Sequence, residues 1–173
     1  MDSTLPKTGL NRNDIQQQWD NYTVDDMNWK EGKFFGYVYY PGEEYYNVIK
    51  DAYSKFSATN ALNPAVFPSL NKMENEVVRI AANLLHGDEH VSGCMTSGGT
   101  ESIYMAVKAA KEWAKKNMAT KNPLLLVAST AHPAFCKAAD AIEFNHKTIK
   151  VDANFQLDLE DLKKNMTTDV AMV

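Results

Sequence analysis

A glycine turn between two apolar segments most constrains what this chain can fold into. The turn, Ser97-Gly98-Gly99-Thr100-Glu101-Ser102, follows Gly93-Cys94-Met95-Thr96 and precedes an apolar-periodic run from Ile103 to Trp113. This order predicts a short buried strand, a turn and a helix. The first amides of a helix lack intrahelical acceptors and carry the positive end of its dipole, and glycines let the backbone close on an anion. The segment therefore predicts a phosphate site, with the hydroxyls of Thr100 and Ser97 as further donors.

The turn does not match the common nucleotide-binding patterns. Neither G-x-x-x-x-G-K-[ST] nor G-x-G-x-x-G occurs in the chain. The residues alone therefore leave the kind of phosphate open. An ordinary tight connection between a strand and a helix is the alternative.

Strands and helices are predicted to alternate after the turn, which is typical of a parallel α/β sheet. Buried strands are predicted over Leu124 to Ser129, Lys147 to Val151 and Asp169 to Val173. Helices are predicted between them, over Ala134 to Ile142 and from a cap at Asp158 to Asn165.

His132 lies just after the first of these strands. Ligands of open α/β sheets collect beyond the carboxyl ends of the strands, where the glycine turn is also expected. An aromatic ring stacked on His132 and a phosphate on the turn would then belong to one ligand. A structural histidine is the alternative, and Lys137 on the following helix is a solvated lysine or a cofactor-linked one.

The N-terminal part is predicted to be an arm and helical segment over residues 1–58, ahead of a domain over residues 59–173. Helices are expected from Asn13 or Asp14, over Glu43 to Phe56, and from an N-cap at Ser69 to a stop at Gly87. The tyrosines between positions 37 and 46 either donate hydrogen bonds in a site or pack the arm.

Composition excludes several function classes. The net charge of -4 and a pI of about 5.5 argue against nucleic-acid binding. The longest apolar run, Leu124 to Ala128, is too short to cross a membrane, so a cytoplasmic protein is expected. Cys94 and Cys136 are expected to be buried free thiols. No metal is expected at His86 and His90, because Gly87 ends the helix between them.

Four segments, in order, resemble the sphingosine-1-phosphate lyase family of pyridoxal-phosphate (PLP) enzymes. The resemblance runs from about Gly32 to Val173 and implies an N-terminal arm followed by the first part of the large PLP-binding domain of a fold-type I enzyme, the aspartate-aminotransferase fold. The segments are Asn60-Ala61-Leu62-Asn63-Pro64-Ala65-Val66-Phe67-Pro68-Ser69-Leu70, Met73-Glu74-Asn75-Glu76-Val77-Val78, Gly93 to Ile103, and Ala131-His132-Pro133-Ala134-Phe135-Cys136-Lys137-Ala138-Ala139.

The resemblance also implies roles for single residues. His132 would stack on the PLP ring, Tyr39 matches an active-site tyrosine, and Asn60 matches an asparagine that reaches into the site of the neighbouring subunit in a homodimer. The phosphate would be held by Ser97, Gly98, Gly99 and Thr100. The implied reaction is retro-aldol cleavage of a phosphorylated long-chain base to a fatty aldehyde and phosphoethanolamine.

Two departures from the family leave the substrate open. Asn63 stands where the family has a histidine thought to bind the substrate phosphate, and Phe35 replaces a serine. The family's Schiff-base lysine and the aspartate paired with the pyridinium nitrogen are expected beyond Val173, so these residues alone are predicted to be an inactive fragment. A PLP amino-acid decarboxylase and a non-catalytic module that binds a phosphorylated ligand are the alternatives.

Overall fold

The computed structural model describes residues 7–34 and 36–173. The chain divides into two compact units, Met1–Asn63 and Pro64–Val173. Phe35, one of the two departures from the family pattern, lies outside the described residues, as do the first six residues of the expected arm. The functional division at residues 58 and 59 stays a prediction.

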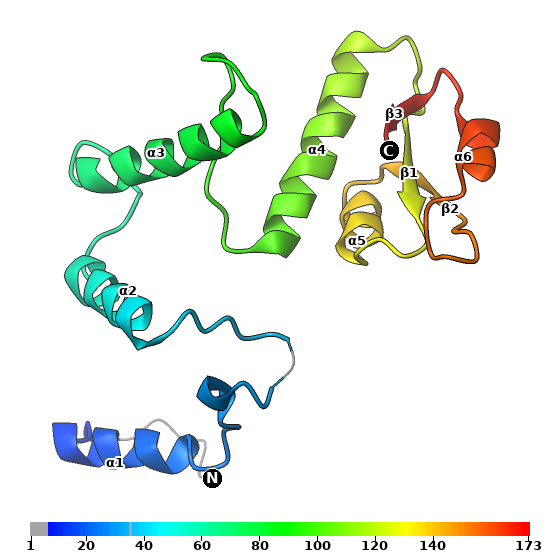
Figure 1. Cartoon of the computed structure of the whole chain (residues 1–173). Coiled ribbons are helices and arrows are strands. Elements are labelled where there is room, and N and C mark those ends of the chain that lie inside the picture. Colours follow the sequence, from blue (N-terminus) through cyan, green and yellow to red (C-terminus); the bar gives the residue numbers. More distant parts are fainter. Residues whose placement is uncertain (1–6, 35) are drawn as a thin grey trace. The chain divides into compact units, whose positions relative to one another are not determined.

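The described part of the first unit contains two helices and a short 3-10 turn (Figure 1). They are α1 (Arg12–Tyr22), η1 (Trp29–Glu31) and α2 (Glu43–Phe56). The predicted bounds of α2 are confirmed. The prediction that Asn13 or Asp14 opens α1 is wrong, because the side chain of Asn11 accepts the amide hydrogen of Asp14 at 3.0 Å and caps the helix earlier.

The second unit begins with α3 (Pro68–Leu84). The predicted N-cap at Ser69 is wrong by two residues, because Pro68 is already helical and Phe67 is the N-cap. Proline suits this place, since its missing amide hydrogen would have no intrahelical acceptor there. After the helix ends, the Gly87 amide donates to the Ala82 carbonyl at 2.8 Å. A Cβ at Gly87 would lie 2.8 Å from a methyl group of Val91, which explains the glycine.

A parallel three-stranded sheet forms the centre of this unit, as the sequence predicts. The strands are β1 (Leu124–Ala128), β2 (Asn145–Ile149) and β3 (Val170–Met172), in the order β2-β1-β3. The expected strand over Lys147 to Val151 starts two residues earlier than predicted, because pairing with Leu124 begins at Asn145.

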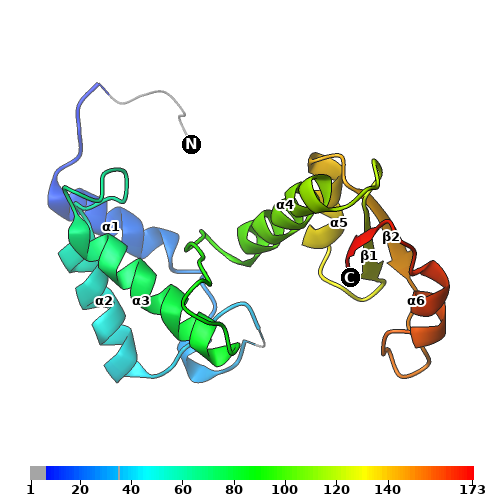
Figure 2. The same ribbon diagram turned by 90° about the horizontal axis from the view of Figure 1, so that it is seen from above.

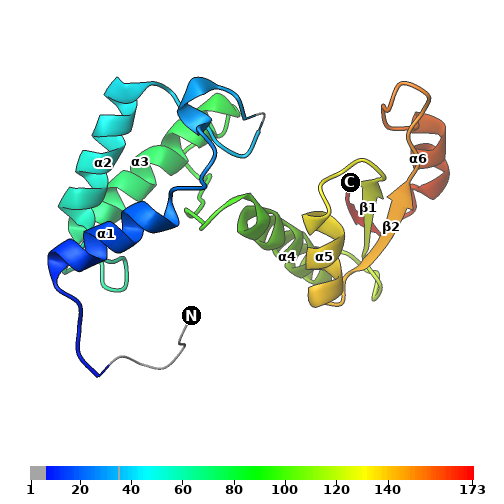
Figure 3. The ribbon, with the colours of Figure 1, turned by 90° about the horizontal axis from the view of Figure 1, so that it is seen from below.

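Three helices accompany the sheet: α4 (Gly99–Asn117), α5 (Ala134–Ala141) and α6 (Leu159–Asn165). In all three views α4 and α5 lie on one side of the strands and α6 on the other (Figures 1, 2 and 3). The connection through α5 leads from β1 to β2, and the connection through α6 leads back across the sheet from β2 to β3. Because both crossovers are expected to be right-handed, α5 and α6 lie on opposite faces of the sheet.

The core lies between β1, α4 and α5. It consists of buried side chains from these elements and from the loop before β2, namely Val107, Leu125, Val127, Ala138, Ala139 and Phe144. The predicted cap of α6 is confirmed, since the Asp158 carboxylate accepts the amides of Glu160 and Asp161 at 2.9 and 3.1 Å.

The segment before the glycine turn differs from its prediction. Residues 93–96 form no strand, because a strand needs a neighbour to share its backbone hydrogen bonds and the described residues offer none there. Both cysteines are free as predicted, but the prediction that they are buried is wrong, because Cys94 is exposed and Cys136 is half-buried. Among the described residues no helix is long and apolar enough to span a membrane.

Candidate cofactor site

The start of α4 presents three backbone amides to an anion. No acceptor among residues 7–34 and 36–173 takes the N–H groups of Gly99, Thr100 and Glu101, and the first helical bond runs from Ser102 to Gly98. A Cβ at Gly98 or Gly99 would meet no atom within 4 Å. No contact within the described chain therefore requires glycine at these positions, and the space where their side chains would begin is open. This arrangement fits a phosphate group.

The two donors of Ser97, its amide and its hydroxyl, already donate hydrogen bonds within the same turn. The Glu101 carboxylate accepts the Ser97 amide at 2.7 Å and its hydroxyl at 2.6 Å. Thr96 adds a second contact across the turn, with its hydroxyl 2.6 Å from that of Ser102. The role of Ser97 as a phosphate donor stays a prediction, whereas the Thr100 hydroxyl has no partner in the described part of the chain.

Sequence reasoning missed Glu101 and Thr96 as residues that shape the turn. Glu101 is at the third helical position, where a capping box places its acid, but it reaches back four residues to Ser97 and not three to the N-cap Gly98, which has no side chain to reciprocate. An acid at the third helical position was the available signal, although the full capping-box pattern is not present. Glu101, in the first turn of α4, thus stabilises the turn that precedes the helix.

The Ser97 contacts hold the pKa of Glu101 below its ordinary value of 4.5, the hydroxyl contributing most and the amide next. A lowered pKa means that this contact stabilises the fold above about pH 4.5 and is lost as the pH falls through the lowered value. We expect a carbon-13 NMR titration of the Glu101 carboxyl to show this lowered midpoint. The Ser97→Ala variant removes the larger cause and should move the midpoint back toward 4.5; an unchanged midpoint would contradict the assignment.

His132 is exposed and held by the backbone that follows it. Its Nδ1 accepts the Ala134 amide at 3.1 Å, at the start of α5. The proton of the neutral ring therefore lies on Nε2. This contact orients the ring without using its faces, which stay available for stacking.

The glycine turn and His132 lie on the same side of the second unit. Figure 1 shows α4 beginning and β1 ending at the lower side of the view. His132 lies in the loop that joins β1 to α5. This is the side where parallel sheets bind ligands, as the sequence predicts.

The other predicted residues belong to the first unit. The Tyr39 side chain is 93% exposed. The Asn60 side-chain oxygen accepts the Leu62 amide at 3.1 Å, and Asn63 lies at the end of the same loop. The structure does not relate these three residues to the glycine turn, so their roles stay predictions.

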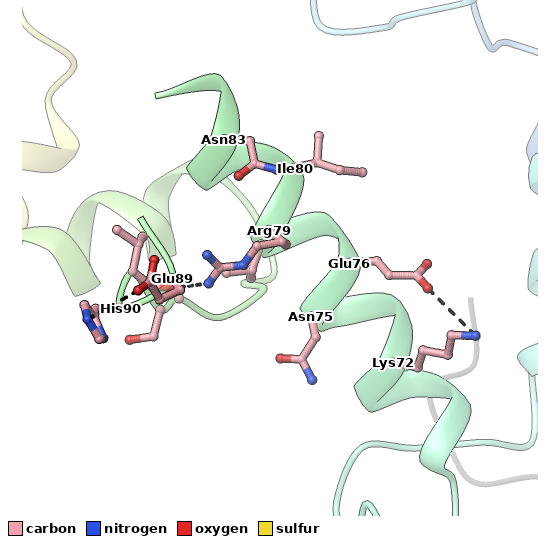
Figure 4. Close-up of a pocket in the computed structure, with 12 residues that line it drawn as sticks. Lys72, Asn75, Glu76, Arg79, Ile80, Asn83, Glu89 and His90 are labelled. Carbon is pink, nitrogen blue, oxygen red and sulfur yellow. Dashed lines mark hydrogen bonds and ion pairs between the residues drawn. The ribbon is translucent and has the colours of Figure 1, made fainter. Parts of the chain in front are cut away.

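A hollow of about 820 Å³ beside α3 contains none of the predicted site residues (Figure 4). Its charged side chains have partners within the chain: Lys72 pairs with Glu76 at 3.9 Å, and His90 pairs with Glu89 at 3.8 Å. The Arg79 guanidinium donates to two backbone carbonyls. We therefore assign this hollow no ligand. Within the described ranges no three His, Cys, Asp or Glu side chains are grouped to hold a metal.

Comparison with known proteins identifies the kind of site. The family model described as the pyridoxal-dependent decarboxylase conserved domain matches residues 2–172. The sphingosine-1-phosphate lyase of Dictyostelium discoideum is 37% identical over 172 residues, which cover 98% of this chain and 32% of that protein. A probable L-aspartate decarboxylase of Pyrococcus furiosus is 25% identical over 163 residues, 94% of this chain and 42% of that protein.

A solved structure confirms the expected fold. The Burkholderia pseudomallei sphingosine-1-phosphate lyase superposes with a TM-score of 0.87 at 30% identity, covering 96% of this chain and 40% of that one. This chain thus spans about a third of the Dictyostelium enzyme and two fifths of the bacterial structure. The predicted resemblance and cofactor are confirmed: the chain belongs to the pyridoxal-dependent decarboxylase family, whose cofactor is pyridoxal phosphate.

Proposed function

We propose that this chain is part of a PLP-dependent carbon–carbon lyase that cleaves phosphorylated long-chain bases to a fatty aldehyde and phosphoethanolamine. The observation that carries the cofactor site is the group of three unpartnered amides at the start of α4. The lyase branch is supported by the 37% identity to the Dictyostelium enzyme, against 25% to the aspartate decarboxylase.

The proposed roles follow the residues described above. Gly98, Gly99 and Thr100 bind the cofactor phosphate, with Ser97 beside them, and His132 stacks on the ring. PLP supplies an electron sink for the charge left on Cα when the Cα–Cβ bond breaks.

Tyr39 is proposed to act on the substrate as a proton donor or acceptor, and Asn60 to enter the site of the neighbouring subunit in a homodimer. Asn63 is proposed to contact the substrate. We also propose that these 173 residues do not catalyse the reaction alone, because the resemblance assigns the Schiff-base lysine to a later part of the family's sequence.

Asn63 favours a second candidate, a PLP-dependent amino-acid decarboxylase. The side chain stands where the lyase family has a histidine for the substrate phosphate, and an amide is a weaker partner for a phosphate dianion than a protonated imidazole. The aspartate decarboxylase relative belongs to this second class by its name.

A product assay on the holoenzyme that contains this chain separates the two candidates. We expect release of a long-chain aldehyde from a phosphorylated long-chain base, without carbon dioxide from aspartate or glutamate. Asn63→His should raise the affinity for the phosphorylated base about threefold if Asn63 contacts the phosphate. Carbon dioxide release with no aldehyde would support the decarboxylase instead.

A further inference from the structure

Five side chains of the first unit form a compact cluster around the Lys30 ammonium group, and the Lys50 ammonium lies outside this cluster, 4.9 Å from the ring centre of Tyr46. Lys30 Nζ lies 2.6 Å from Glu43 Oε1 and 5.6, 5.7 and 5.1 Å from the ring centres of Trp29, Tyr40 and Tyr46. The three rings contact one another edge to face, with centres 5.4 to 6.0 Å apart. We call these residues the Lys30 cluster. Aromatic faces attract a cation, and a carboxylate beside it completes the charge balance.

The Lys30 cluster joins the two ends of a loop. Lys30 belongs to η1 and Glu43 begins α2, thirteen residues later. Between them Tyr37 has a left-handed backbone, with φ of 61°, and its ring contacts Phe34 at 5.9 Å. A non-glycine residue keeps such a conformation only where its surroundings impose it.

Tyr39 depends on this loop for its position. In the described structure it has no ring contact, ion pair or hydrogen bond of its own, and it is 93% exposed. Its neighbour Tyr40 is fixed by the rings of Trp29 and Tyr46. The position of Tyr39 therefore depends on the adjacent Tyr40, whose ring contacts the Lys30 ammonium.

We propose that Lys30 is a positioning residue for Tyr39, holding the loop closed through Glu43 and the three rings. This inference rests on the proposed function for its effect on catalysis. Glu43 both raises the pKa of Lys30 and has its own pKa lowered, first by Lys30 and then by the Tyr40 hydroxyl. Both groups are therefore charged throughout the neutral range.

The chain offers a matched control in Lys33. Its Nζ lies 2.6 Å from Glu31, an ion pair as short as that of Lys30. The pair spans two residues instead of thirteen, and among the described residues no ring lies under the Lys33 ammonium. Removing the Lys33 charge thus removes a surface ion pair without opening the loop.

The kinetic test uses the holoenzyme. Lys30→Met should lower kcat about tenfold with KM changed less than twofold, because the substrate still binds while Tyr39 is misplaced. Lys30→Arg should keep kcat near the wild-type value, since arginine retains both the ion pair with the Glu43 carboxylate and the ring contacts. Lys33→Met should change neither kcat nor KM. In a Tyr39→Phe background Lys30→Met should change kcat less than twofold. An equal fall of kcat in both backgrounds would overturn the proposal.

A spectroscopic readout separates this inference from the proposed function. With 3-fluorotyrosine incorporated, the Tyr39 fluorine signal is assigned by its loss in Tyr39→Phe. Lys30→Met should shift and sharpen that signal as the loop opens, whereas Lys33→Met should leave it in place. If the wild type releases no aldehyde, the proposed function fails and the fluorine signal still decides the positioning. An unmoved signal in Lys30→Met, or in Lys30→Gln should the first variant not fold, overturns it.

Discussion

Replacing Gly98 and Gly99 together by alanine should abolish tight cofactor binding while leaving the fold intact. We expect the affinity of the apoenzyme for PLP to fall about 100-fold, or about 2.8 kcal/mol, as two amide hydrogen bonds to a charged phosphate are lost. A Cβ at either glycine meets no protein atom, and we expect the added methyl groups to crowd a phosphate held by the amides of Gly99 and Thr100. Equilibrium titration of the apoenzyme with PLP measures the loss.

The stability of the same variant should change in the opposite direction. Neither glycine has a φ in the left-handed region, and a Cβ at either would meet no protein atom. Alanine then restricts the unfolded chain and raises the free energy of unfolding by about 0.5 kcal/mol per site. Urea denaturation of the apoenzyme measures this change.

Gly9→Ala is the matched control, because a Cβ at Gly9 also meets no atom within 4 Å and its backbone is not left-handed. It should change neither PLP affinity nor stability beyond the effect of one alanine. Full PLP affinity in the double variant would show that the turn is an ordinary connection between a loop and a helix.

Leu125→Ala should produce the largest loss of stability. Leu125 is the second residue of β1, is 1% exposed and packs in the core with α4 and α5. Truncating it leaves a cavity, so we expect the free energy of unfolding of the sheet-containing unit to fall by about 3 kcal/mol. Urea denaturation followed by circular dichroism measures this fall. Because β1 leads into the loop of His132, cofactor binding should weaken together with the loss of the sheet.

Leu159→Ala provides the control for this second prediction. Leu159 begins α6 and is 60% exposed, so the same truncation removes little buried area. Its effect should stay within about 0.5 kcal/mol. A loss below about 1 kcal/mol for Leu125→Ala would mean that β1 is not the centre of the core.

Local features of this protein were predictable from its sequence. The bounds of α2 follow from apolar spacing, and the start of α6 follows from the Asp158 carboxylate, which caps its own helix. The strand at Leu124 is a short apolar run bounded by turns. Each of these signals depends on neighbours within a few residues along the chain, so no tertiary contact was needed to find them.

The errors lie where a distant partner decides the outcome. The segment from Gly93 to Thr96 has the apolar character of a strand but no strand beside it, so it stays irregular. Lys30 and Glu43 are ordinary charged residues in the sequence, and their shared cluster depends on how the loop between them closes. Ser97 and Glu101 likewise show their contact only once the first turn of α4 has formed.

The sequence by itself determined the parallel α/β class, the glycine turn at a helix start and the family resemblance that implies PLP, because these depend on residue type and spacing. Only the tertiary structure decided which donors of the turn are unpartnered, how His132 is oriented and what holds the loop that contains Tyr39. Those properties depend on which groups meet in space, and a hydrogen bond or a cation over a ring forms only when the fold brings its two members together.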